Sequence, residues 1–516
     1  TTRHSFDMLG EGARSWDDAD RYFAAYQEAL HLMASVDTNS RHGDRAWGQR
    51  QGISVKLSAL HPRFEPAHIT SVMSELVPRL VKLIQLAHAK GLMLTIDAEE
   101  SFRLELQLAV VEAVLPDTSG GLGLAIQAYQ HRALDMITAV MGLARKHGQP
   151  MGIRLVKGAY WDSEIKRAQE LGLAGYPVYT NKAHTDLAYL ACADVLLAHT
   201  DCIYPQFATH NATTIAAVLE LIKLHGVEPD RYEWQRLQGM GEALYREVRQ
   251  TTPSHMAQAP LRIYAPVGAH RDLLAYLVRR LLENGANSSF VHQLSDPAIS
   301  LDELLGSPWL DASGAAAGPD LPLPPNLFGQ HRHNAMGRDL QCQAHREGIE
   351  ALLSLPAQPR QVARSSAEDA QALMLRLHTA WPDWEMTPVA QRCDVLNRAA
   401  QLIESEFDSW VVDLMQEARK TMADAVAEVR ETIDLARYYA QQGRQHLTVQ
   451  ALPGPTGESN EWQLRARGVF VCIAPWNFPL AIFGGQVMGA LVCGNAVAAK
   501  PAEQTPAIGL RFMQLL

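Results

Sequence analysis

Gly152-Ile-Arg-Leu-Val-Lys157-Gly-Ala-Tyr-Trp161 is the stretch from which the fold can be worked out. Its apolar, β-branched run ends in a cation, and a glycine and two aromatic residues follow. A short apolar run bounded by such a turn is typical of a buried strand in a parallel sheet. Similar runs alternate with longer amphipathic stretches from about Gly52 to Asn284. We predict strands over Ile53–Leu57, Leu92–Asp97, Leu122–Gln127, Gly152–Lys157, Val178–Thr180, Tyr204–Thr209, Glu233–Gln238 and Leu261–Ala265.

Eight strands separated by helices predict an α/β fold, a closed parallel (βα)8 barrel. Helices are expected over Ile69–Lys90, His131–His147 and Thr185–His199, among others. Polar or aromatic residues stand at the predicted strand ends, where barrel enzymes place their chemistry. The alternative is that several of them only cap the following helices. These residues are Lys56, Asp97, Gln127, Lys157, Asn181 with Lys182, His210 with Asn211, Gln238 and Tyr264.

The composition is that of a globular protein with several domains. The chain has 516 residues, of which 46 are basic and 56 acidic, so its net charge of −10 disfavours general binding to nucleic acid. Six cysteines without a Cys-x-x-Cys pair indicate a reducing cytoplasm and no metal site. The chain begins with Thr1, so we expect the translation start to lie elsewhere, and no signal peptide is visible.

Four segments are expected along the chain. Residues 1–50 form a helical lead-in, 51–300 the barrel, 301–365 a proline-rich linker, and 366–516 the start of a second α/β domain that is not finished at Leu516. Helices of the second domain are predicted over Ala367–Thr379, Val389–Glu406 and Asp424–Tyr439.

The uncharged stretch Gly468–Ala499 is long enough to cross a bilayer. Pro475, Pro479 and several glycines interrupt it, so we favour a buried strand–turn–helix–strand unit.

A candidate substrate clamp lies on a helix predicted over His270–Asn284. Tyr276, Arg279, Arg280 and Glu283 share one face of that helix by their spacing. Two arginines beside a tyrosine can bind one carboxylate through charge-assisted hydrogen bonds, with the glutamate holding one arginine in place. A solvated charged face is the alternative.

A flat, phosphate-bearing cofactor would suit the segments Arg154–Trp161, Thr180–Lys182 and Thr209–Asn211, which combine cations, hydroxyls and aromatic rings. The dinucleotide fingerprint of a Rossmann unit is absent from the barrel region, because Gly239-Met-Gly241 is followed by leucine at position 244. Any dinucleotide is therefore expected to bind to the barrel itself.

These residues belong to longer motifs that resemble proline dehydrogenase, and with the second domain the chain is similar to the proline utilization A family. In that family a proline dehydrogenase is joined to an L-glutamate-γ-semialdehyde dehydrogenase. The motifs are Phe6-Asp-Met-Leu-Gly-Glu11, Ser54-Val-Lys-Leu-Ser-Ala-Leu-His-Pro62, Asp97-Ala-Glu-Glu100, Arg154-Leu-Val-Lys-Gly-Ala-Tyr-Trp161, Ala208-Thr-His-Asn211 and Tyr276-Leu-Val-Arg-Arg280.

The resemblance implies an FAD-dependent oxidation of L-proline to Δ1-pyrroline-5-carboxylate, by transfer of a hydride to flavin N5. It also implies quinone as electron acceptor, peripheral contact with the inner membrane and a homo-oligomer. The proton released by the amine would go to Lys56 or to bulk water. Arg154, near flavin N5, would tune the flavin's potential.

Site residues follow from the same resemblance. Lys56, Asp97 and Tyr264 would be catalytic and, with Leu237, Tyr276, Arg279 and Arg280, would bind proline; Glu11 would pair with Arg279. FAD would be held by Gln127, Arg154, Val156, Lys157, Gly158, Ala159, Tyr160, Trp161, Thr180, Asn181, Lys182, Thr209, His210, Asn211 and Glu283.

Two motifs of the second domain resemble the aldehyde dehydrogenase superfamily. In Ala474-Pro-Trp-Asn477-Phe-Pro, Asn477 would donate to the oxyanion of a thiohemiacetal. In Ala499-Lys500-Pro-Ala-Glu503, Lys500 and Glu503 would hold the ribose of NAD. Neither Cys472 nor Cys493 has the context of the superfamily's nucleophile, so the second activity is expected only if the chain continues.

Two other functions are compatible with parts of the sequence. A strand-end lysine, Lys56 or Lys157, could form a Schiff base in an aldolase barrel. Some relatives implied by the resemblance also bind DNA through a separate N-terminal domain, but no basic module of that kind is present in these residues.

Overall fold

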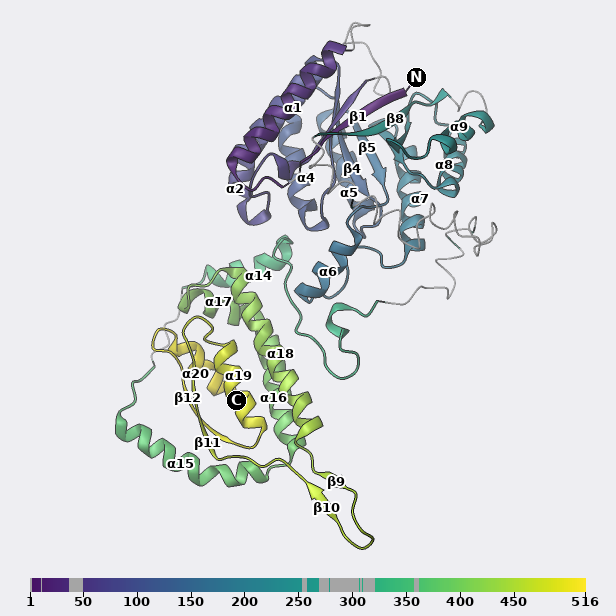
Figure 1. The fold of residues 1–516 in the computed structure, drawn as a ribbon. Helices are drawn as coiled ribbons and strands as arrows, with labels where there is room; N and C mark the ends of the chain where they lie inside the picture. The colour runs from purple at the N-terminus through teal and green to yellow at the C-terminus, as the bar shows by residue number, and fades with distance from the viewer. Residues whose placement is uncertain are drawn as a thin grey trace. The chain divides into compact units, whose positions relative to one another are not determined.

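The computed structural model describes residues 2–10, 12–36, 50–252, 258–268, 278, 306, 309, 321–356 and 362–516. They fall into two compact units, each with its own hydrophobic core. The first contains Thr1–Ile165 and Pro177–Leu321, and the second contains Lys166–Tyr176 and Pro322–Leu516. Figure 1 shows both units, which are described separately below.

The first unit is a closed barrel of eight parallel strands, in which each strand pairs with the next along the chain and β8 returns to β1. This confirms the predicted barrel. Its strands are β1 (Thr2–Met8), β2 (Gly52–Val55), β3 (Met93–Ile96), β4 (Leu122–Gln127), β5 (Met151–Val156), β6 (Ile203–Ala208), β7 (Glu233–Leu237) and β8 (Leu261–Val267).

One predicted strand is wrong and one was missed. Val178–Thr180 contributes only an isolated antiparallel bridge, from Val178 to Gln130 in the loop after β4. The barrel reaches eight strands because of β1, which was not predicted. It pairs with β8 on one side and β2 on the other, and it lies in the stretch of sequence expected to be a helical lead-in. Its inward residues are polar, so it lacks the apolar run that revealed the other strands.

Helices surround the barrel (Figure 1), and most crossovers contain one between consecutive strands. The connection from β5 to β6 contains two, α6 and α7, with no barrel strand between them, and most of α6 belongs to the second unit. This is why the short run before α7 was mistaken for a strand. The helices are α1 (Trp16–Val36), α2 (Ile69–Ser71), α3 (Val77–Ala89), α4 (Leu104–Val114), α5 (Ala133–His147), α6 (Trp161–Leu171), α7 (Lys182–Ala198), α8 (Ala212–His225) and α9 (Glu242–Thr251).

Local capping fixes where two of the barrel helices begin. The side chain of Asn181 accepts a hydrogen bond from the Ala183 N–H, and Asn211 does the same for Thr214. Asparagine is among the best N-cap residues because its oxygen satisfies an otherwise unpaired backbone donor. The capping alternative raised for these strand-end residues is therefore correct for both asparagines.

The second unit packs helices against the parallel pair β11–β12 and has a separate antiparallel hairpin, β9–β10. Gly468–Ala499 folds as the predicted strand–helix–strand unit, and no helix among the described residues is long and apolar enough to cross a membrane. The elements are α14 (Gln343–Leu353), α15 (Ala367–Met386), α16 (Val389–Ser405), α17 (Phe407–Glu417), α18 (Met422–His446), β9 (Gln450–Leu452), β10 (Asn460–Trp462), β11 (Val469–Ile473), α19 (Ala481–Val492), β12 (Ala496–Lys500) and α20 (Pro506–Leu515).

Candidate active site

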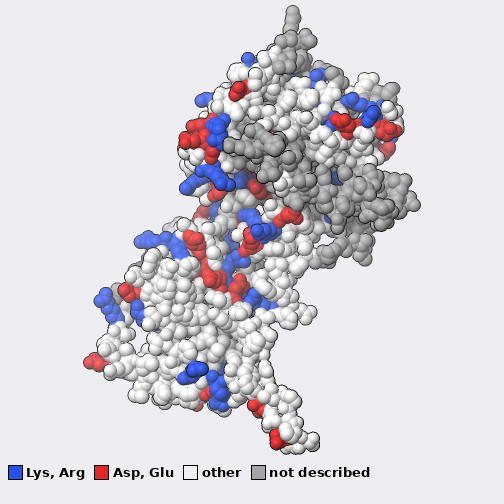
Figure 2. Space-filling view, in the orientation of Figure 1, with Lys and Arg blue, Asp and Glu red and all other residues white. Residues whose placement is uncertain are grey.

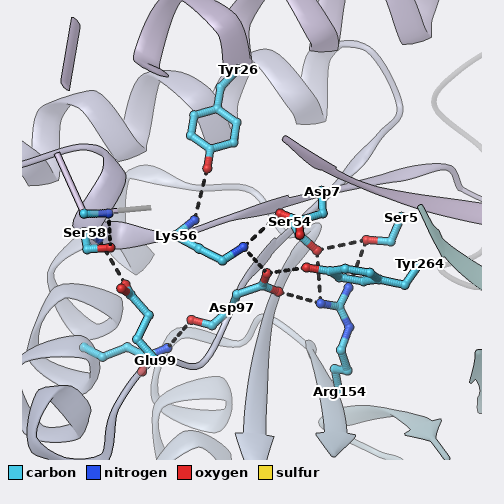
Figure 3. Close-up of polar contacts among 12 residues, drawn as sticks. Ser5, Asp7, Tyr26, Ser54, Lys56, Ser58, Asp97, Glu99, Arg154 and Tyr264 are labelled. Atoms are coloured by element: carbon cyan, nitrogen blue, oxygen red, sulfur yellow. Dashed lines mark hydrogen bonds and ion pairs between the residues drawn. The ribbon is translucent and has the colours of Figure 1, made fainter. Parts of the chain in front are cut away.

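Four predicted residues meet at the carboxyl ends of the barrel strands, together with one residue that was not predicted (Figure 3). Lys56 Nζ lies 2.9 Å from Asp7 Oδ1 and 3.3 Å from Asp97 Oδ2. The Tyr264 hydroxyl donates to Asp97 Oδ2 at 2.7 Å, and Arg154 donates to Asp97 Oδ1 at 2.6 Å. Lys56, Asp97, Arg154 and Asp7 are all buried, so their charges interact in a poorly solvated environment.

Arg154 connects this cluster to polar residues inside the barrel. Besides Asp97, its guanidinium donates to Ser5 (2.9 Å), Ser54 (3.0 Å) and Gln235 (2.8 Å). The guanidinium carbon lies 5.0 Å from the centroid of the Tyr264 ring, within the range of a cation–π contact. The position of Arg154 is therefore fixed by groups from β1, β2, β7 and β8.

The pKa values of the two carboxylates in the cluster shift in opposite directions because the carboxylates have different cations. Burial raises the pKa of both, but Lys56 and Arg154 together outweigh it for Asp97 and hold that pKa below the usual value. Asp7 has Lys56 as its cation, and burial keeps the pKa of Asp7 above the usual value. Burial lowers the pKa of Lys56, but Tyr264, Asp7 and Asp97 outweigh it and raise that pKa well above the usual value.

A second charged layer lies deeper in the barrel. Arg262 forms a bidentate ion pair with Glu233, through Nε to Oε1 at 2.6 Å and through a terminal nitrogen to Oε2 at 2.8 Å. The Gln235 amide donates to Glu233 at 2.7 Å and accepts from Arg154, so it connects the two layers. Each charge in the lower layer thus has a partner inside the protein.

Gln127 links three of the loops that follow the strands. Its amide nitrogen donates to the backbone oxygen of Glu99 at 2.8 Å, and its oxygen accepts from the Ala159 N–H at 3.1 Å. The carboxylate of Glu99 in turn accepts from the Ser58 N–H at 3.0 Å. Gln127, predicted to bind the cofactor, therefore also fixes the loop that contains Ala159.

Two lysines predicted to bind the cofactor converge on one carboxylate. Lys157, directly after Val156 at the end of β5, and Lys182, at the start of α7, both form ion pairs with Asp186. Since two cations share one anion, the group carries a net positive charge. Burial lowers the pKa of Lys157, and Asp186 opposes that effect.

The loop from Gly158 to Trp161 passes close to the β4 loop. Gly158 has φ of +148°, and a Cβ at this position would collide with the ring of Tyr129, so only glycine fits without rearrangement. Trp161 presents an exposed indole whose N–H donates to the backbone carbonyl oxygen of Tyr179 at 3.0 Å. Tyr160 lies immediately before α6, and Thr180 is exposed next to the N-cap of α7.

The remaining barrel candidates form a group after β6 and β7. Thr209 Oγ1 accepts from the Asn211 N–H at 3.1 Å, and His210 Nε2 accepts from the Leu237 N–H at 3.1 Å. The structure thus assigns local structural contacts to these residues. Glu11, Tyr276, Arg279, Arg280 and Glu283 lie outside the described residues, as does most of the predicted His270–Asn284 helix.

In the second unit, the predicted residues are on the surface. Asn477 is exposed in the loop between β11 and α19. Lys500, at the end of β12, lies 3.2 Å from Glu503, and both side chains are exposed. The two residues that the motif suggests for NAD binding therefore lie next to each other.

Sequence reasoning missed Ser5, Asp7, Ser54 and Gln235. All four are buried inside the barrel. Side chains along a strand point alternately to its two faces, so inward residues recur at every second position. The available signal was this period of two: Ser5 with Asp7, and Ser54 with Lys56. Polar residues at successive inward positions indicate a site as well as a strand.

A closed parallel barrel with buried acids, cations and a phenol at its carboxyl end defines a (βα)8-barrel enzyme. Residues 1–293 match the family model described as proline dehydrogenase, and residues 357–516 match the aldehyde dehydrogenase family. The chain belongs to the proline dehydrogenase family.

The chain is similar to two longer proteins. "Bifunctional protein PutA" of Klebsiella aerogenes is 44% identical over 558 residues, covering 100% of this chain and 41% of the relative. The Escherichia coli (strain K12) protein of that name matches with the same identity and coverage. The chain thus spans about two fifths of the length of these relatives.

Solved structures show the same arrangement of elements. A proline utilization A mutant (D779W) of Bradyrhizobium japonicum has a TM-score of 0.92 and 50% identity, covering 99% of this chain and 52% of that one. The protein from Bdellovibrio bacteriovorus, described as inactivated by N-propargylglycine, has a TM-score of 0.88 and 30% identity, covering 99% and 56%.

Proposed function

We propose that the barrel unit oxidises L-proline to Δ1-pyrroline-5-carboxylate with FAD as the hydride acceptor. The observation that carries this proposal is the cluster of buried Lys56, Asp97 and Arg154 with the half-buried Tyr264, at the carboxyl end of a barrel of this family. Bound FAD would supply the two-electron oxidation that no amino-acid side chain can perform.

The described residues fit such a cofactor. Lys157, Lys182 and Asp186 together carry a net positive charge next to the N-terminus of α7. This charge and the helix N-terminus both favour binding of a pyrophosphate. The exposed Trp161 ring offers a surface for stacking. Gly158 allows the chain to turn closely against Tyr129 in the loop that leads to Trp161.

The substrate would be positioned by charge. The carboxylate of proline is matched by Arg279 and Arg280, and the ring by Leu237, Tyr264 and Tyr276, as the sequence predicts. Lys56 would face this carboxylate from the other side of the site. Asp97, which accepts hydrogen bonds from Lys56, Arg154 and Tyr264, would fix the positions of these three side chains. Such positioning is the main contribution of a protein to a hydride transfer.

The second unit would contribute Asn477, Lys500 and Glu503 to an NAD-dependent oxidation of glutamate semialdehyde in a longer polypeptide. Quinone as electron acceptor, contact with the inner membrane and a homo-oligomer remain part of this proposal. On the face in Figure 2, basic and acidic side chains are intermixed among the described residues, so that face offers no broad basic surface for DNA.

The test is a visible spectrum of the purified protein before and after anaerobic addition of L-proline. Flavin bands that bleach with proline would support cofactor, substrate and reaction together, and Arg280→Met should then bleach only at much higher proline. Flavin bands that never bleach would overturn the substrate. A folded protein that does not bind added FAD would favour the aldolase alternative, which borohydride trapping of a carbonyl compound on Lys56 or Lys157 would test.

A further inference from the structure

Asp7 has no role in the function proposed so far, although it is one of the most buried carboxylates in the barrel. Only 2% of its surface is exposed, and its Oδ1 lies 2.9 Å from Lys56 Nζ. It comes from β1, which pairs with β2 so that Asp7 stands opposite Ser54, two residues before Lys56. The register of the barrel seam thus delivers this carboxylate to the lysine.

Lys56 is held between two carboxylates that reach it from the strands on either side of β2. Asp7 approaches from β1 and Asp97 from the end of β3, and together they accept two of the three N–H groups of the ammonium (Figure 3). Two further titratable groups, Tyr264 from β8 and Tyr26 from α1, also face Lys56. The Tyr26 hydroxyl accepts from the Lys56 backbone N–H at 3.3 Å.

Asp7 and Asp97 differ in the number of side chains that donate hydrogen bonds to them. Asp97 also accepts from Arg154 and Tyr264, so its charge is shared among three donors. Asp7 directs its ion pair to Lys56. We propose that Asp7 is a positioning residue that keeps Lys56 as an oriented ammonium at the mouth of the barrel and prevents it from acting as a base.

This inference rests on the proposed oxidation of proline and decides whether Lys56 or water accepts the proton that the amine releases. In that reaction the ring carbon beside nitrogen loses a hydride to FAD, and the nitrogen loses a proton as the C=N bond forms. An ammonium held by two carboxylates has no lone pair to accept that proton. The proton therefore leaves to water, and Lys56 serves only as a fixed cation facing the substrate carboxylate.

The test compares the pH dependence of kcat/KM for L-proline in the wild type and in Asp7→Asn. The wild type should show no loss attributable to Lys56 up to about pH 10, because lysine's ordinary pKa is about 10.4 and this one is raised. Asp7→Asn should lower kcat/KM about tenfold near neutral pH, the size expected for one hydrogen bond to a charged group. It should also introduce a new decline on the alkaline side, as the buried lysine loses its proton.

Three variants separate this role from a merely structural one. Asp7→Glu should restore the wild-type profile, and Ser5→Ala, on the same face of β1 but in contact with Arg154, should not create the alkaline decline. In a Lys56→Met background, Asp7→Asn should change the profile no further. Urea unfolding of the four proteins of this double-mutant cycle gives a readout independent of activity, and should show coupling between Asp7 and Lys56.

The outcomes distinguish the two proposals. If the wild type does not oxidise proline, the proposed function fails. If the wild type is active but the Asp7→Asn profile runs parallel to it, or if Asp7→Asn acts equally in the Lys56→Met background, the role of Asp7 is overturned. If Asp7→Asn does not fold, a normal profile in Asp7→Glu together with an alkaline decline in Asp7→Ser would support the role, and no decline would contradict it.

Discussion

The barrel holds two layers of buried charge, and they differ in how completely their donors are used. Arg262 in the lower layer uses every N–H of its guanidinium, on Glu233, the backbone oxygens of His4 and Arg50, and the Met93 sulfur. In the upper layer, the described contacts use two of the three N–H groups of Lys56. A saturated cation can only hold the protein together, whereas an unsaturated one at the carboxyl end can also bind a ligand.

The largest effect is expected in the lower layer, on stability. Arg262→Met leaves Glu233 buried without its cation, and removing one partner of a buried pair costs about 3–5 kcal/mol. Urea unfolding of the barrel should show this loss, and Arg262→Met/Glu233→Leu should recover part of it. A loss below about 1 kcal/mol would mean that the pair is not the lower layer's main support.

The upper layer should respond mainly in activity. Lys56→Met removes the cation between Asp7 and Asp97, and we expect kcat/KM for proline to fall about 10–100-fold, the equivalent of 1.5–3 kcal/mol for hydrogen bonds to a charged group. Asp7, whose pKa is already raised, can take up a proton and limit the loss of stability. Rapid-mixing measurements of flavin reduction would test this, and a stability loss equal to that of Arg262→Met would erase the distinction between the layers.

A smaller change in the same layer is expected for Tyr264→Phe. The substitution removes the 2.7 Å hydrogen bond to Asp97 but keeps the ring over Arg154. We expect about a tenfold lower kcat/KM and a loss of about 1 kcal/mol in unfolding free energy. Tyr204→Phe, near the lower layer, is the matched control and should leave kcat/KM unchanged.

His61 provides a buried titratable group outside both layers. Its Nδ1 accepts from the Arg63 N–H at 3.0 Å, so Nε2 carries the proton toward Glu75. Burial lowers the pKa of His61 even though Glu75 opposes this, so the folded state binds its proton less readily than the unfolded state. Stability should therefore fall as pH drops from about 6.5 toward the lowered pKa. Thermal unfolding of His61→Gln should show a weaker pH dependence, and an unchanged one would contradict the assignment.

The smallest effect, none at all, is expected from the second unit. Asn477 is exposed in a loop outside the barrel, so Asn477→Ala should leave proline-dependent flavin reduction unchanged. A reduced rate would show that the barrel reaction depends on the second unit.

How far the sequence could predict this molecule depended on the faces of the strands. β4, whose range was predicted correctly, is buried throughout and therefore appears as an apolar run. β1 carries Ser5 and Asp7 toward the interior, so the feature that makes it part of the site also removed its apolar pattern. Lys56 and Asp97 were found because they follow apolar runs, while their partner Asp7 depends on pairing between segments about 50 residues apart.

The strand that supplies Asp7 also determines when the site can form. β1 is made before the other strands of the barrel, but its pairing with β8, from Thr2 opposite Leu261 to Met8 opposite Val267, must wait until some 250 further residues have been made. At about 5–20 residues per second, that interval lasts roughly tens of seconds. During it, the edge of β1 that will pair with β8 has no partner strand. Closing the barrel is therefore also the step that brings Tyr264 of β8 to Asp97 and completes the cluster.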